Sequence, residues 1–146
     1  MKLRPYQQEA VDAIVNEFKQ DNVRSTLVVM ATGLGKTILS AAVVNHVLPD
    51  RSMLLAHREE LIFQGADKIG KFTGAEVGIE MADNRVDEGG MFAPPPVIAS
   101  SIQTQNAGGD GLGRKTKFDP NNFVLLIIDE AHHATAKSYR RVMEYY

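Results

Sequence analysis

The stretch at 27–37 carries the residue types that a phosphate-binding turn requires. Gly33 and Gly35 allow a sharp turn and leave backbone N–H groups uncovered, so an anion can lie against the loop and the helix behind it. Lys36 and Thr37 add a cation for phosphate oxygens and a hydroxyl for a magnesium ion. An apolar run before the turn completes the pattern, which predicts a site for a nucleoside triphosphate with Mg²⁺.

One position departs from the strict pattern G-x-x-x-x-G-K-[ST], because Met30 stands where the first glycine would be. The alternative is an ordinary strand-to-helix turn that happens to use glycine. The triplet Gly-Lys-Thr directly after a buried apolar run favours phosphate binding over that alternative.

A second cluster, Asp129 and Glu130, follows the apolar run at 123–128. A carboxylate at the end of a strand beside the phosphate loop can hold Mg²⁺ opposite Thr37. The neighbouring Glu130 can orient and deprotonate the water that attacks the γ-phosphate. The alternative is an acidic pair that only caps the next helix; the presence of the phosphate loop favours the catalytic interpretation.

Strands alternate with helices along the chain, and this order predicts an α/β fold with a parallel β-sheet flanked by helices. The run at 123–128 is apolar at every position, as expected of a central parallel strand. The expected helices are 6–18, 36–48, 61–72 and 139–146; the expected strands are 26–30, 53–56, 77–81, 97–100 and 123–128; and the longest loop is 106–122.

In such a sheet, ligands bind at the carboxyl ends of the strands. Polar residues follow four of the expected strands, at the phosphate loop, 57–58, 101–105 and 129–132. We therefore expect these four clusters to meet at one edge of the sheet.

Length and composition predict one domain of an ordinary globular class. The 146 residues are 44% hydrophobic and 23% charged, with a net charge of −2 and no cysteine. Disulfide frameworks and thiolate metal sites are thereby excluded. No apolar run approaches the roughly 20 residues of a membrane span. The lack of cysteine is compatible with a cytoplasmic protein, which is the localisation we expect. Any nucleic-acid contact must be local, since the chain has no overall basic character.

The segments Ala31–Thr37 and Asp129–His132 resemble motifs I and II of the superfamily 2 helicases of the DEAH-box type. The resemblance is strongest to the branch of type III restriction motors and bacterial repair helicases. In that superfamily the phosphate loop has the pattern Thr-Gly-x-Gly-Lys-Thr. This pattern requires no glycine at position 30, so Met30 is compatible with it. Three weaker segments also resemble family motifs: 3–7, 57–61 and 99–104.

The resemblance implies a role for each matching residue. Gln7 could instead be an ordinary solvated glutamine, and Arg58 could instead form a salt bridge with a neighbouring carboxylate. The pair at 132–133 does not suggest zinc, because adjacent helical residues do not face one site. The implied roles are ATP binding for Arg4, Tyr6, Gln7, Thr32, Gly33, Leu34, Gly35, Lys36 and Thr37; catalysis for Lys36, Asp129 and Glu130; Mg²⁺ binding for Thr37 and Asp129; nucleic-acid contact for Arg58, Gln103 and Thr104; and coupling for His132.

The resemblance also implies that residues 1–146 are a partial N-terminal RecA-like ATP-binding domain. The family has a further strand beyond the last helix and a second RecA-like domain, whose arginines stabilise the transition state. We expect the ATP-binding part of a helicase or translocase that moves on nucleic acid, with DNA favoured over RNA. This chain alone should bind nucleotide weakly and hydrolyse it very slowly. The alternatives are a duplex-translocating restriction or remodelling motor without strand separation, or a nucleotide-binding module without activity.

Overall fold

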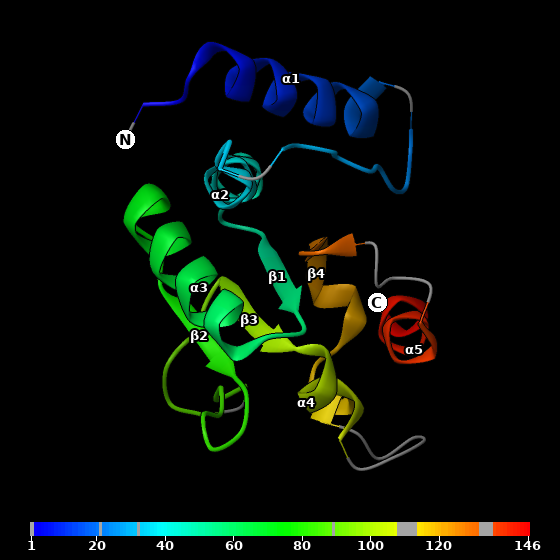
Figure 1. Cartoon of the computed structure of the whole chain (residues 1–146). Helices are drawn as coiled ribbons and strands as arrows, with labels where there is room; N and C mark the ends of the chain where they lie inside the picture. Colours follow the sequence, from blue (N-terminus) through cyan, green and yellow to red (C-terminus); the bar gives the residue numbers. More distant parts are fainter. Residues whose placement is uncertain (1, 21, 32, 89, 108–113, 132–135) are drawn as a thin grey trace.

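A computed structural model describes residues 2–20, 22–31, 33–88, 90–107, 114–131 and 136–146, and Figure 1 shows the arrangement of its elements. Helices and strands alternate through most of the chain, as the sequence predicts. In order they are α1 (Pro5–Gln20), α2 (Lys36–Val47), β1 (Arg51–Ala56), α3 (Glu59–Thr73), β2 (Val77–Glu80), β3 (Val97–Ser101), α4 (Ile102–Asn106), the 3₁₀ turns η1 (Arg114–Lys117) and η2 (Pro120–Asn122), β4 (Phe123–Ile128) and α5 (Lys137–Tyr145).

The strands form a sheet in the order β2-β3-β1-β4, and every pairing is parallel. β1 lies between β3 and β4, with Leu54 level with Ala99 on one side and Ile127 on the other. Parallel neighbours require crossover connections, and here they consist of helices or longer loops. The predicted α/β fold with a parallel sheet is confirmed.

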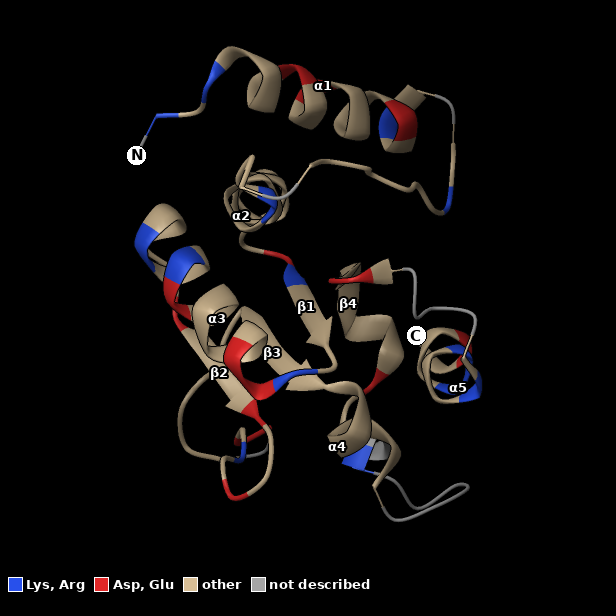
Figure 2. Ribbon diagram, in the orientation of Figure 1, with Lys and Arg blue, Asp and Glu red and all other residues tan. Residues whose placement is uncertain are grey.

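Alternate residues of β1 supply two separate cores, as the two-residue period of a strand requires. Leu54 and Ala56 face α2 and α3, whereas Met53 and Leu55 face the side that carries α4 and α5. The strands carry charged residues only at their ends, where Arg51 begins β1 and Glu80 ends β2 (Figure 2). Among the described residues, no helix is long and apolar enough to cross a membrane.

Helix α1 lies outside the sheet layers and packs on the outer side of α2 (Figure 1). Val11 and Ile14 of α1 contact a cluster that includes Leu39 and Val43 of α2. α2 is therefore covered by α1 on one side and by the sheet on the other. This position explains why its sequence is apolar on almost every side, as predicted.

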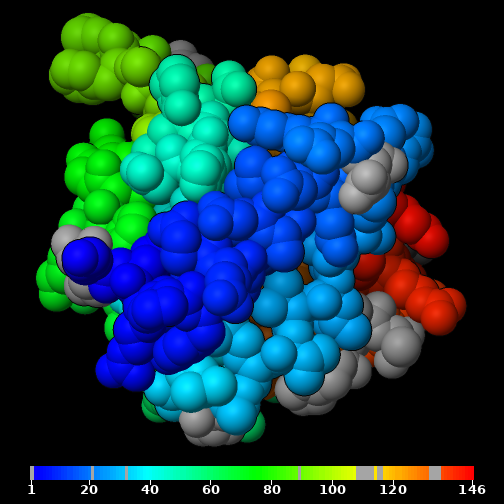
Figure 3. Space-filling model, turned by 90° about the horizontal axis from the view of Figure 1, so that it is seen from above, coloured from blue at the N-terminus to red at the C-terminus, as the bar shows by residue number. Residues whose placement is uncertain are grey.

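The strand expected at 26–30 is absent, and that prediction is wrong. Residues 22–31 contain no strand; Leu27 is 72% exposed and Val29 is 85% exposed. In Figure 3 the light-blue chain that follows α1 lies at the surface. A strand needs a hydrogen-bonded neighbour, and none of the described strands pairs with this segment.

The expectation of a central β4 is also wrong, because β4 is an edge strand of the described sheet. Its six residues are apolar, yet Val124 is 59% exposed. Among the described residues, β4 pairs with β1 but has no partner on its outer edge, and the exposed segment 26–30 pairs with no strand at all.

Candidate active site

The phosphate loop has the backbone conformation for which its glycines were predicted. Gly33 and Gly35 have φ angles of 83° and 84°, in the left-handed region that a side chain disfavours. Gly35 is the N-cap of α2, and the exposed Lys36 is the first residue of that helix. Thr32 lies outside the described residues. The amide groups that begin α2 and the cation of Lys36 therefore lie together, as phosphate binding requires.

The first turn of α2 points toward the carboxyl edge of the sheet. α2 packs against β1 and β4, and its last residue, Val47, is joined to the start of β1 by only three residues, 48–50. Its 12 residues span about 18 Å, close to the roughly 20 Å of a six-residue strand. The helix thus runs back along β1, and Lys36 lies toward the edge where β4 ends.

Residues of the N-terminal segment contact the phosphate loop directly. The Tyr6 hydroxyl and Gln7 Nε2 both donate to the Leu34 carbonyl, each at 3.1 Å. Gln7 Oε1 accepts the Arg4 backbone N–H at 2.9 Å, and Arg4 Nη1 donates to the Tyr6 hydroxyl at 3.3 Å. Gln7 is 5% exposed. It is therefore not a solvated helix residue, and the structure brings three of the predicted ATP-binding residues to the loop.

The acidic pair follows β4 at the carboxyl edge. Asp129 N donates to the Leu55 carbonyl at 2.9 Å, which continues the pairing of β4 with β1. Asp129 Oδ1 accepts the Glu130 backbone N–H at 2.9 Å. Glu130 has a φ of 53°, a conformation that costs a non-glycine residue on the order of 1–3 kcal/mol and is concentrated at functional sites. His132 lies outside the described residues.

Tyr139 of α5 interacts electrostatically with this acidic pair. Burial raises the pKa of Tyr139, and the negative charges of Glu130 and Asp129 raise that pKa further. Tyr139 is 4% exposed and packs with β1 residues in the core on this face. α5 therefore lies close to the end of β4 as well as against the sheet.

The residues predicted to contact nucleic acid divide into exposed and buried ones. Arg58 is exposed before α3, and the exposed Gln103 donates from Nε2 to the His57 carbonyl at 3.0 Å. Thr104 is 7% exposed. Its backbone N–H donates to Ser101 Oγ at 3.1 Å, and its hydroxyl accepts from that oxygen at 2.8 Å. The structure thus brings Gln103 beside the turn that carries Arg58 and places Thr104 in the interior, where its backbone N–H is capped by Ser101 at the start of α4.

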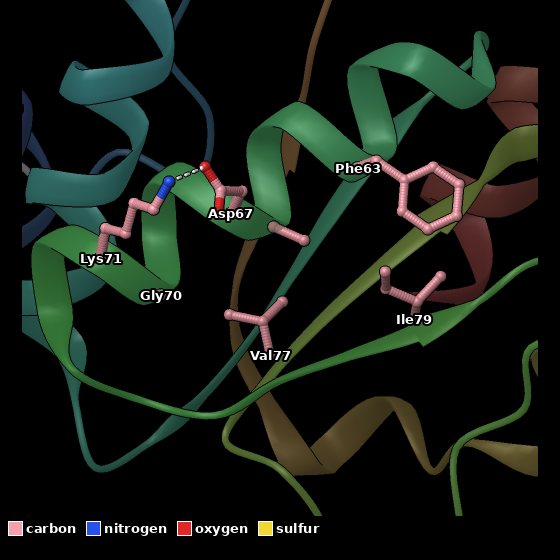
Figure 4. Close-up of a pocket in the computed structure, with 7 residues that line it drawn as sticks. Phe63, Asp67, Gly70, Lys71, Val77 and Ile79 are labelled. Atoms are coloured by element: carbon pink, nitrogen blue, oxygen red, sulfur yellow. Dashed lines mark hydrogen bonds and ion pairs between the residues drawn. The ribbon is translucent and has the colours of Figure 1, made fainter.

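Two of the pockets that the described residues form could not be predicted from the sequence. The larger, of about 430 Å³, lies between α3 and the edge strand β2; Figure 4 shows Phe63 above Ile79, and the ion pair of Lys71 with Asp67 at its rim. The smaller, of about 270 Å³, lies between α4 and α5 at the carboxyl edge and is lined by both apolar and polar residues, among them Ile102, Gln103 and Tyr139. Only the smaller pocket adjoins residues predicted to be functional.

Comparisons with known proteins agree with this arrangement. The family model described as "Type III restriction enzyme, res subunit" (ResIII) matches residues 1–146. The chain is 36% identical over 154 residues to "Putative ATP-dependent helicase IRC3" of Saccharomyces cerevisiae, which covers 99% of this chain and 21% of that protein. It is 27% identical over 139 residues to "DNA 3'-5' translocase XPB2" of Sulfurisphaera tokodaii, covering 95% of this chain and 27% of that protein.

A solved structure shares the fold. It is that of a nuclease-deletion mutant of the Type ISP restriction-modification enzyme LlaGI in complex with a DNA substrate mimic, with a TM-score of 0.68 at 20% identity, covering 97% of this chain and 16% of that chain. The chain spans about a fifth of the length of the curated relatives it matches, 21% and 23% for the helicases of budding and fission yeast. Because the family model matches the whole chain, the resemblance read from motifs I and II is confirmed: the chain belongs to the ResIII family, the N-terminal motor domain of superfamily 2 helicases.

Proposed function

We propose that this chain is the ATP-binding, N-terminal RecA-like domain of a motor that couples ATP hydrolysis to movement on nucleic acid. The observation that carries the proposal is the left-handed pair Gly33 and Gly35, which starts α2 toward the same edge that holds Asp129 and Glu130. A phosphate cradle and a carboxylate pair on one edge of a parallel sheet suit phosphoryl transfer from a nucleoside triphosphate.

Each residue of the site has a distinct task in this proposal. Lys36 and the amide groups that begin α2 bind the phosphate oxygens. Glu130 orients the attacking water and accepts its proton. The Thr37 hydroxyl and the Asp129 carboxylate are oxygen donors of the kind that Mg²⁺ prefers, so they would hold the ion. When bound, Mg²⁺ supplies charge neutralisation at the β- and γ-phosphates.

Arg58 and Gln103 are the residues we propose to contact the nucleic-acid strand. Both are exposed, and the hydrogen bond from Gln103 to His57 brings the two side chains to neighbouring turns of the carboxyl edge. A guanidinium and an amide suit a sugar-phosphate backbone. DNA is favoured over RNA, because XPB2 is named a DNA translocase and the LlaGI enzyme was solved with a DNA mimic.

We also propose that a further strand and a second RecA-like domain complete the motor. β4 has an open, apolar edge, and the apolar segment 26–30 lies exposed. α5 returns the chain to the start of β4, where the Tyr146 and Phe123 rings lie 5.6 Å apart. A right-handed crossover from that point would place a parallel strand beside β4, between it and 26–30. In a longer chain that contains this strand, amide exchange at 26–30 should slow; unchanged exchange would contradict the proposal.

Titration of the chain with ATP and Mg²⁺ tests the nucleotide site. Lys36→Ala should weaken binding at least tenfold, because the substitution removes the cation that faces the phosphates. Lys71→Ala is the matched control, since Lys71 forms an exposed ion pair with Asp67 on α3. Equal affinity of the wild type and Lys36→Ala would refute the phosphate-loop assignment.

The longer protein separates the remaining alternatives. ATPase activity that nucleic acid does not stimulate would contradict the motor and leave a nucleotide-binding module. A strand-displacement assay beside a triplex-displacement assay distinguishes the two kinds of motor. Displacement of a triplex strand without separation of a duplex would identify the alternative, a translocase of the restriction or remodelling type.

A further inference from the structure

The carboxylate of Glu80 is a buried charge that the nucleotide site does not use. Glu80 ends β2 and is fully buried. Its Oε1 accepts Arg114 Nε at 3.0 Å, and its Oε2 accepts Lys117 Nζ at 2.8 Å and the Val86 backbone N–H at 2.6 Å. Two cations and a backbone amide thus compensate a charge that would be very costly to bury alone.

Arg114 connects this carboxylate to the end of α4. Its guanidinium also donates to the carbonyls of Ala82 and Asn84, at 2.8 and 3.0 Å. Its backbone N–H donates at 3.0 Å to the carbonyl of Ala107, the C-cap residue of α4. One arginine therefore joins the end of α4 to Glu80 and to the turn that follows β2.

A second route runs from the backbone of Glu80 to the inner face of α4. Ser100 Oγ donates to the Glu80 carbonyl at 2.7 Å and accepts Gln105 Nε2 at 2.9 Å. Gln105 is fully buried, and its Oε1 accepts the Tyr146 hydroxyl at 2.9 Å. A buried network whose polar groups are paired fixes one arrangement of the elements it joins.

α4 depends on such anchoring because its five residues are too few for a helix that is stable by itself. The helix carries the exposed Gln103, whose amide contacts the backbone of His57 beside Arg58. Where α4 lies therefore decides where Gln103 lies relative to Arg58.

We propose that Glu80 is a positioning residue for nucleic-acid binding: through Arg114 and Ser100 it holds α4 so that Gln103 and Arg58 contact the same strand. The inference rests on the proposed function, which assigns those two residues to the nucleic-acid interface. Glu80 itself is buried and acts only through its partners.

The variant Glu80→Gln tests this role, because it keeps the side-chain size and removes the charge that holds Arg114 and Lys117. We expect an oligothymidylate single strand with a fluorescent label to bind about tenfold more weakly, a loss of about 1.4 kcal/mol. The affinity for a fluorescent ATP analogue with Mg²⁺ should stay within about twofold of the wild type. Ser100→Ala removes only the hydrogen bonds of Ser100 Oγ to the Glu80 carbonyl and to Gln105, so it should weaken oligonucleotide binding by less than Glu80→Gln does.

Glu88→Gln is the matched control for lost stability. Glu88 forms a half-buried ion pair with Arg51, which begins β1 and therefore lies at the opposite edge of the sheet. The control should lower the melting temperature as Glu80→Gln does and leave oligonucleotide affinity unchanged.

Four results would overturn the proposal. Equal oligonucleotide binding by Glu80→Gln and the wild type would remove the positioning role alone. Equal losses in Glu80→Gln and Glu88→Gln, or a parallel loss of ATP binding, would reduce Glu80 to a structural residue. A wild-type chain that binds ATP and no oligonucleotide would refute both this inference and the nucleic-acid part of the proposed function.

Discussion

Replacement of Gly35 by alanine tests the contact between the phosphate loop and α1. Gly35 has a φ of 84°, and a Cβ at this position would lie 2.5 Å from Gln7 Nε2. Gln7 cannot swing away freely, because it is 5% exposed and donates to the Leu34 carbonyl at 3.1 Å. Gly35→Ala must therefore strain the loop backbone and also displace Gln7.

The two effects can be estimated separately. The left-handed conformation costs a residue with a Cβ about 1–2 kcal/mol, and the loss of the partly buried hydrogen bond from Gln7 to Leu34 costs about 1 kcal/mol more. ATP requires this loop conformation, whereas the free loop can relax away from it. The sum of roughly 2–3 kcal/mol then appears as ATP binding that is roughly 30- to 150-fold weaker.

Isothermal titration with ATP and Mg²⁺ measures the loss of ATP affinity. Alanine substitutions at two other glycines separate the backbone cost from the cost of the lost contact with Gln7. Gly33 has a φ of 83° with no atom within 4 Å of its Cβ position, so Gly33→Ala carries the backbone cost alone. Gly74 ends α3 with a φ of 72° and is equally open. Gly74→Ala should lower stability by about 1–2 kcal/mol and leave ATP affinity unchanged.

A double-mutant cycle identifies the contact itself. Gln7→Ala should weaken ATP binding less in the Gly35→Ala background than in the wild type, because the clash and the hydrogen bond are already lost there. If Gly35→Ala weakens binding no more than Gly33→Ala, and the effects of Gln7→Ala and Gly35→Ala simply add, the reasoning is refuted.

Three further predictions concern stability. Burial alone would raise the pKa of Glu80, but its hydrogen bonds lower that pKa below the usual 4.5. The stabilisation that the Glu80 carboxylate provides is therefore complete above pH 4.5 and is lost as the pH falls below that value. The free energy of unfolding in urea should accordingly change less between about pH 6 and about pH 3.5 in Glu80→Gln than in the wild type. Ile98→Val, at a fully buried position of β3, should cost about 0.5–1.5 kcal/mol in urea unfolding, and a cost near zero would contradict its burial. Ser101→Ala removes the side-chain cap of α4 and should cost about 1 kcal/mol; amide exchange at 102–106 should accelerate, and unchanged exchange would show that the cap contributes nothing.

Elements with a local signal could be predicted from the sequence. Ile62, Ala66 and Ile69 recur at helical spacing, and all three are buried on α3. The apolar run at 53–56 is buried in β1. Helical and strand periodicities depend only on neighbours along the chain, so they can be read without knowledge of the fold.

The position of a strand within a sheet has no such local signal. The segment 26–30 is apolar enough to be buried, yet Val29 is 85% exposed, because pairing needs a neighbour that comes from elsewhere in the fold. β4 is apolar at all six positions and is nevertheless an edge strand. Apolar content indicates that a segment can be buried, whereas strand order depends on contacts between distant segments.

The candidate site likewise has features that could be predicted from the sequence and features that could not. Its motifs located the glycines and charged groups, but not the carbonyl of Leu34, which receives hydrogen bonds from Tyr6 and Gln7. A backbone acceptor has no sequence signature. Gln103 and Thr104 are adjacent in one predicted cluster, and only the packing of α4 decides that the first is exposed and the second is buried.

The register of the sheet explains why these scattered residues meet at one edge. Ala56 is level with Ser101, and Leu55 is level with Ile128, so β1, β3 and β4 end within one residue of each other. Whatever follows each strand must therefore emerge at the same edge, whether it is the turn with Arg58, the helix α4 or the acidic pair. A shift of one strand by a single residue would move its polar cluster by about 3.3 Å and turn its side chains to the opposite face. The buried registers of β1 and β3 thus hold the predicted site together, although none of their apolar residues belongs to it.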